Sequence, residues 1–132
     1  MIVDTSALIA VLRKEPEYLV FGRILDEAKT VRISAAAYVE FSIVIDRRRD
    51  PVMSREIDTL LDRFNVQIEP VTAEQASIAR QAYRDYGRGS GHPANLNFSG
   101  CFSYALARDK REPILFKGDD FNHTDLRPAL DV

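Results

Sequence analysis

Short apolar runs along the chain alternate with longer segments in which apolar residues return every three or four positions. The short runs are rich in aliphatic and β-branched residues, which is typical of buried strands. They lie at Met1–Val3, Thr30–Ser34, Val66–Val71 and Ile114–Phe116. The spacing between them predicts helices over Ala7–Leu12, Phe21–Ala28, Ala36–Arg49, Ile57–Phe64, Thr72–Tyr86 and Ser99–Lys110. This alternation predicts an α/β fold with a mostly parallel sheet and right-handed connections.

Local signals refine two of these helices. Thr72 followed by Gln75 matches a capping box, with the threonine as N-cap. The helix over Ala36–Arg49 ends in Arg47–Arg49, where positive charge suits the helix dipole. Its apolar stripe is expected to be Val39, Ile43 and Val44.

Composition and charge limit the class of protein. The chain has 132 residues, 45% of them hydrophobic, which is the size of one domain. Its one cysteine, Cys101, excludes an intrachain disulfide and favours a reducing compartment. The N-terminus lacks the features of a signal peptide, and no apolar run approaches the ~18 residues of a membrane span. We therefore expect a cytoplasmic protein with no membrane partner.

The formal net charge of −2 does not suit a protein that coats nucleic acid through bulk charge. Any polynucleotide substrate must then be held by a local patch and by metal. The candidates for phosphate contacts are Arg84, Arg88 and Lys117. Arg80 belongs with the two arginines, because the three follow each other at a spacing of four residues. A solvated helix face is the alternative interpretation of the arginines.

Acidic residues follow three of the expected strands. Asp4 comes directly after the first, Glu40 lies about one turn into the helix after the second, and Asp119 and Asp120 follow the last. In open α/β sheets, binding sites form beyond the carboxyl ends of the strands. Oxygen ligands gathered there would suit Mg²⁺ or Mn²⁺, because a cation offsets their mutual repulsion. Taken singly, these residues also fit an N-cap, a solvated helix residue and a turn.

Several stretches resemble one known family. Asp4-Thr5-Ser6-Ala7 resembles the opening of PIN-domain nucleases, Tyr38-Val39-Glu40 their second acidic motif, and Ile114–Phe121 their last. Three further segments resemble VapC-type toxins of bacterial toxin–antitoxin pairs, particularly mycobacterial ones: Tyr83–Gly89, Leu96-Asn97 and Phe121–Leu126. The resemblance spans nearly the whole chain.

The resemblance implies a fold, an activity and partners. Residues 1–132 would form one PIN-like domain, a three-layer α/β/α structure around the sheet. It would hydrolyse RNA with Mg²⁺ or Mn²⁺ held by Asp4, Glu40 and either Asp120 or Asp119, with Ser6 supporting the site. A small antitoxin would insert an arginine or similar group among the carboxylates.

The resemblance also implies assembly as a homodimer or a toxin–antitoxin hetero-oligomer. The apolar stripes of Phe21–Ala28 and Ile57–Phe64 are generous for a small core, so part of that surface is expected to serve it.

One acidic position departs from the family pattern. Where the family reads Leu-Asn-x-Gly-Asp-Cys-Phe, this chain has Gly100 in place of the aspartate. Ser99 before it could support the site by holding a metal-bound water, but its hydroxyl lacks the charge that Mg²⁺ favours. The alternative function is therefore a PIN-fold binding module with crippled catalysis. A phosphoryl-transfer protein with Asp4 as nucleophile is disfavoured, because Ser6 occupies the second aspartate of that pattern.

Other conspicuous side chains receive ordinary interpretations. His92 and His123 have no partner at metal-ligand spacing and are expected on the surface or in loops. Tyr38, Phe41 and Tyr83 are expected in the core.

Overall fold

The computed structural model describes residues 1–130, and its strands form one parallel sheet. The strands are β1 (Ile2–Val3), β2 (Val31–Ser34), β3 (Val66–Glu69) and β4 (Ile114–Leu115). They lie side by side in the order β3-β2-β1-β4, and every pairing is parallel. Each strand predicted from the sequence is present, and each is shorter than expected, β3 by two residues and the others by one.

The helices follow the predicted order. They are α1 (Thr5–Leu12), α2 (Tyr18–Glu27), α3 (Ala35–Asp46), α4 (Pro51–Arg63), α5 (Ala73–Tyr86) and α6 (Phe98–Lys110), and a 3-10 turn covers Asp120–His123. The longest of them, α5, has 14 residues, and within residues 1–130 no helix has the length and apolar character to cross a membrane.

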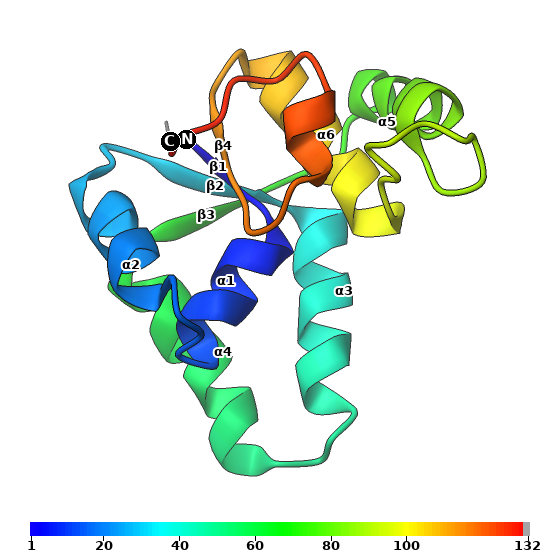
Figure 1. Ribbon diagram of the computed structural model, residues 1–132. Helices are drawn as coiled ribbons and strands as arrows, with labels where there is room; N and C mark the ends of the chain where they lie inside the picture. Colours follow the sequence, from blue (N-terminus) through cyan, green and yellow to red (C-terminus); the bar gives the residue numbers. More distant parts are fainter. Residues whose placement is uncertain (131–132) are drawn as a thin grey trace.

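Helices cover both faces of the sheet (Figure 1). Because neighbouring strand residues point to opposite faces, Val3 and Leu115 pack into one core with α1–α4. Ile2 and Ile114 pack into a second core with α5 and α6. The three-layer α/β/α architecture expected from the sequence is confirmed.

The packing of α3 corrects two expectations. Its buried residues are Ala37, Phe41 and Ile45, whereas Val39 and Ile43 are 52% and 58% exposed. The helix ends at Asp46, so the three following arginines lie beyond its last turn. Two of the three residues of the expected stripe are therefore exposed, and the third, Val44, is half-buried.

The stripes of α2 and α4 also differ from the expectation. Phe21 and Leu25 on α2, and Ile57, Leu60 and Leu61 on α4, are buried in the first core. Because these side chains are buried in the core, they are not available as an association surface.

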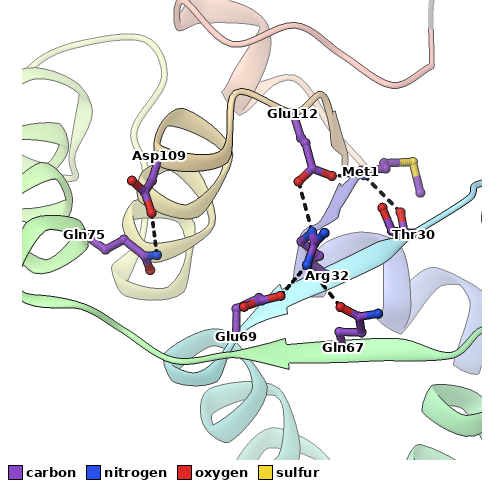
Figure 2. Close-up of polar contacts among 8 residues, drawn as sticks. All are labelled: Met1, Thr30, Arg32, Gln67, Glu69, Gln75, Asp109 and Glu112. Carbon is purple, nitrogen blue, oxygen red and sulfur yellow. Dashed lines mark hydrogen bonds and ion pairs between the residues drawn. The ribbon is translucent and has the colours of Figure 1, made fainter.

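At the start of α5, Thr72 caps the helix by accepting a hydrogen bond from the Gln75 amide at 3.0 Å. The reciprocal half of the predicted capping box is absent, because the buried Gln75 side chain donates to Asp109 on α6 at 2.9 Å (Figure 2). The residue that would complete the cap instead joins α5 to α6.

A cluster of ionic side chains surrounds Arg32 of β2 on the face of the sheet that α6 covers (Figure 2). Arg32 donates to Glu69 of β3 at 2.6 Å and to Glu112 at 3.0 Å. Glu112 also pairs with the Met1 ammonium group, which donates to the Thr30 carbonyl at 3.0 Å. The cluster thus joins the amino ends of β1 and β2 to the segment before β4.

Candidate active site

The strand order brings the predicted acidic residues to one edge of the sheet. β2, β1 and β4 are neighbours and parallel, so their carboxyl ends meet at the same edge, here called the carboxyl edge. Asp4 follows β1, Glu40 lies on α3 after β2, and Asp119 and Asp120 follow β4. The topology therefore supplies the positional condition that an α/β site requires.

Asp4 is 6% exposed, and its two carboxylate oxygens have different surroundings. Oδ2 accepts hydrogen bonds from the Ser6 amide at 3.0 Å and the Ser6 hydroxyl at 2.6 Å, which caps α1. The Ser6 hydroxyl in turn accepts a hydrogen bond from the Lys117 amide at 3.0 Å, so it connects the segment after β4 to α1. Oδ1 is buried and has no hydrogen-bond partner.

Glu40 supplies a second oxygen of this kind. The residue is half-buried on α3, and its Oε2 is buried without a hydrogen-bond partner. A buried carboxylate oxygen that accepts no hydrogen bond is costly, and in proteins such a group calls for a catalytic or ion-binding explanation. Two of them follow neighbouring strands here.

The two aspartates after β4 have different surroundings. The Asp119 carboxylate accepts from Asn122 at 2.8 Å and contacts His123 at 2.8 Å, and these hydrogen bonds lower its pKa. Partial burial of Asp120 raises the pKa of its carboxyl group, an effect that Arg88 opposes and that the charges of Asp4 and Asp119 reinforce. The Asp120 carboxylate therefore interacts with Asp4 and Arg88 across the carboxyl edge. The contact of His123 was missed by the sequence analysis, although its spacing from Asp119 is i, i+4.

The start of α6 shows how Gly100 is accommodated. Asn97 is the N-cap, and its Oδ1 accepts from the Gly100 amide at 2.7 Å and the Ser99 hydroxyl at 3.3 Å. Gly100 is buried, and a Cβ atom there would lie 2.9 Å from that same oxygen. The Ser99 hydroxyl is thus engaged with the cap.

Within residues 1–130, no group of three or more His, Cys, Asp or Glu side chains is arranged to hold a metal ion. The expected set of three or four carboxylates is therefore not gathered as a preformed cluster. Gly100, at the position where the resemblance leads us to expect an aspartate, supplies no carboxylate.

The basic candidates differ in their availability. Lys117 contacts Glu15 at 2.9 Å and Glu17 at 3.2 Å, and the hydrogen bond with Glu15 contributes most to raising its pKa. Arg84 is exposed on the last turn of α5. Arg88 lies just beyond that helix and interacts with Asp120. The three charges therefore have unequal access to a ligand at the carboxyl edge.

Two hydroxyl groups near these elements were missed. Ser34 at the end of β2 and Ser103 on α6 are fully buried, and neither Oγ has a hydrogen-bond partner. Nothing in the local pattern of apolar residues singles them out, because serine fits both strand ends and helix interiors.

Comparison with known proteins identifies the family. A model of the PIN domain matches residues 1–126. The chain belongs to the PIN-domain family. This PIN domain is 56% identical over 131 residues to ribonuclease VapC28 of Mycobacterium tuberculosis, covering 99% of this chain and 98% of that protein. It is 53% identical over 129 residues to ribonuclease VapC42 of the same species, covering 98% of each. The resemblance to mycobacterial VapC-type proteins is confirmed.

Solved structures share the fold of this PIN domain. The sarcin-ricin loop cleaving toxin VapC20 of M. tuberculosis superposes with a TM-score of 0.70 at 21% identity, covering 96% of this chain and 98% of that one. A toxin–antitoxin complex from Klebsiella pneumoniae superposes with a TM-score of 0.71 at 14% identity, covering 99% and 98%. At these identities the similarity concerns the fold alone.

Proposed function

We propose that this chain, as one PIN domain, is a cytoplasmic endoribonuclease and the toxin of a toxin–antitoxin pair. The observation that carries the proposal is the pair of buried carboxylate oxygens without partners, Asp4 Oδ1 and Glu40 Oε2, which follow neighbouring strands. The relatives named ribonuclease support the choice of RNA as substrate.

The residues present fit a hard divalent cation, Mg²⁺ or Mn²⁺. Mg²⁺ is commonly bound through one or two carboxylates, with water and substrate phosphate completing its coordination. Asp4 and Glu40 would hold it, and Asp120 is a better third candidate than Asp119, whose carboxylate is engaged with Asn122 and His123. When bound, such an ion polarises the scissile phosphate and lowers the pKa of a water molecule.

The protein's own groups have separate duties in this proposal. Ser6 holds Asp4 by occupying its Oδ2, which directs Oδ1 away from the cap. Arg88 binds a phosphate of the RNA next to Asp120, and Arg84 contributes to the same positive face. Lys117, paired with Glu15 and Glu17, serves the fold in preference to RNA binding.

The proposed protein partner is a small antitoxin. The exposed side chains of Val39 and Ile43 lie on α3 on either side of Glu40 in the sequence, and they offer an apolar docking face. A cationic side chain of the partner would then pair with the carboxylates at the carboxyl edge. Assembly as a homodimer or as a hetero-oligomer with the antitoxin is part of this proposal.

A second candidate function is favoured by Gly100. With no carboxylate at this position and no preformed group of three ligands in residues 1–130, the chain would be a binding module that retains antitoxin or RNA binding. Cleavage activity of the unmodified chain distinguishes the two.

The test of the proposed function is the Asp4→Asn variant. Asparagine can still accept the Ser6 hydrogen bonds through its amide oxygen, so the cap and the melting temperature should change little. Cleavage of RNA in the presence of Mn²⁺, followed on denaturing gels, should be abolished, and a chelator should abolish it in the unmodified chain. The matched control is Asp58→Asn, at an exposed position on α4. Undiminished cleavage by purified Asp4→Asn would refute the catalytic assignment.

A further inference from the structure

An apolar groove lies between α5 and α6 and is not part of the acidic site. Its volume is about 400 Å³, and its lining includes Ala76 and Ala79 of α5 together with Cys101 and Phe102 of α6. Cavities of this size accommodate small organic molecules. The groove can therefore take a flat ring without rearrangement of the core.

Two exposed aromatic rings line this groove. Tyr83 on α5 is 55% exposed and Phe98 at the start of α6 is 65% exposed. Phe98 packs edge-to-face with Phe102, their ring centroids 4.9 Å apart at an interplanar angle of 63°, which limits its movement. Leaving two large rings exposed at one groove is unfavourable in water, so a ligand that stacks on them is stabilised.

The charge of the groove indicates which ligand fits. Arg80 and Arg88 line it, and its lining contains no aspartate or glutamate. Asn97, which lines the groove, caps the start of α6. Because α6 leads back to the start of the parallel strand β4, this end of the helix lies toward the carboxyl edge. The groove is thus positively charged and adjoins the carboxyl edge.

A second copy of the chain fits this groove less well. In a twofold-symmetric dimer the same patch faces itself. If the groove lay on the twofold axis, Arg80 and Arg88 of both copies would be brought together, and the lining offers no carboxylate to compensate them. An anionic partner avoids this repulsion.

We propose that the α5–α6 groove binds one unpaired nucleobase of an RNA substrate, stacked on Phe98 and Tyr83, while Arg80 and Arg88 bind the flanking phosphates. Stacking on aromatic side chains with backbone contacts from basic residues is how proteins bind single-stranded nucleic acid. The base in the groove would hold the adjoining phosphate toward Asp4 and Asp120. This inference rests on the proposed ribonuclease function, since it names a subsite for its substrate.

The test measures binding with cleavage switched off. Fluorescein-labelled oligouridine of about ten nucleotides, within the usual range of single-strand sites, is titrated in the presence of a chelator and followed by anisotropy. Phe98→Ala and Tyr83→Ala should each weaken binding about tenfold, as loss of one stacking partner does. Inorganic polyphosphate, which has no bases, is used to displace the RNA. Its inhibition constant should be the same for the parent and these two variants, and it should be higher for Arg88→Gln.

Controls separate stacking from folding. Leu19→Ala removes a side chain that is 68% exposed on α2, across the sheet from the groove, and should leave RNA affinity unchanged. Phe98→Tyr keeps the ring and should keep the affinity. Crosslinking of 5-iodouridine RNA should label the peptide that contains Phe98.

Three results would overturn the subsite. They are unchanged RNA affinity in both alanine variants, no binding of oligouridine by the parent, and conversion of a dimer to a monomer by Phe98→Ala at constant RNA affinity. The last would identify the groove as an interface between copies of the chain. The ribonuclease proposal is judged separately by the Asp4→Asn cleavage assay, because the binding assay contains no divalent cation.

Discussion

The carboxylate of Asp4 can serve two purposes at once, because only one of its two oxygens has a hydrogen-bond partner. Oδ2 satisfies the Ser6 amide and hydroxyl at the start of α1, and Oδ1 remains buried without a partner. N-capping and site chemistry were alternatives at the level of sequence, yet the geometry permits both. The cap also fixes the rotamer of the side chain, so the free oxygen is held in position before any ligand arrives.

Gly100 gives a prediction at the same scale. Gly100→Asp supplies the carboxylate of the family pattern and is expected to tighten Mn²⁺ binding and raise RNA cleavage at least tenfold, because it adds both an oxygen ligand and a negative charge. A tenfold change corresponds to about 1.4 kcal/mol. The new Cβ would lie 2.9 Å from Asn97 Oδ1, so the Asn97 side chain must shift. Isothermal calorimetry with Mn²⁺ and a cleavage assay measure the two effects.

Gly100→Ala is the matched control, because it introduces the same Cβ contact without the charge. It should leave Mn²⁺ affinity and cleavage at the level of the parent. If the unmodified chain already cleaves RNA well and Gly100→Asp changes neither quantity, position 100 is not the third acidic site.

Among the elements, α6 shows local backbone strain at its end. Its C-cap, Arg111, has φ 56°, in the left-handed region that glycine adopts without steric cost. The left-handed conformation costs a non-glycine residue about 1–2 kcal/mol, and the greater freedom of glycine in the unfolded chain offsets part of this. Because the side chain is exposed, Arg111→Gly should stabilise the protein by about 0.5–1 kcal/mol. Urea denaturation measures this change. Lys110→Gly, one residue earlier and inside the helix, should instead destabilise by about 1 kcal/mol, and stabilisation by both changes would contradict the argument.

The sequence predicted where elements lie better than which faces they bury. Strand positions and their order in the chain follow from short aliphatic runs, and all were found. The prediction of the buried face of α3 was wrong because apolar residues lie on almost all sides of this helix. Val39 and Ile43 have the same spacing as Phe41 and Ile45. Which set is buried depends on contacts with other helices, which periodicity within one helix does not contain. Tyr83 was also misplaced in the core: it is exposed on α5, whose buried residues are Gln75, Ala79 and Ala82.

Across the whole molecule, carboxylates have opposite situations in two regions of the sheet. At the carboxyl edge, Asp4 and Glu40 each keep a buried oxygen without a partner. Around Arg32, by contrast, Glu69 and Glu112 are each paired with a cation (Figure 2). The position of Asp4 after a strand was readable from the sequence, whereas the pairing of Met1 with Glu112 joins residues at opposite ends of the chain and was not. The paired carboxylates stabilise the fold, whereas the unpaired oxygens of Asp4 and Glu40 are the ones proposed to bind a cation.

The compensated cluster gives the last prediction, which concerns acid stability. Burial alone would raise the pKa of Glu112, but hydrogen bonds and charges from the Met1 ammonium group and Arg32 outweigh this and lower the pKa below its usual 4.5. A carboxylate with a lowered folded-state pKa contributes stability above its unfolded pKa and loses it as the pH falls through the folded value. Glu112→Gln should therefore reduce the free energy of unfolding at neutral pH by about 1–3 kcal/mol, since it removes hydrogen bonds to a charged group.

The difference between Glu112→Gln and the parent should shrink as the pH falls below 4.5, because protonation of Glu112 in the parent removes the same charge. Urea denaturation at several pH values measures it, with Glu56→Gln, at an exposed position on α4, as the control. A constant difference between neutral and acid pH would mean that Glu112 acts through packing and not through its charge. The charge of Glu112 would then make no contribution to a loss of stability at acid pH.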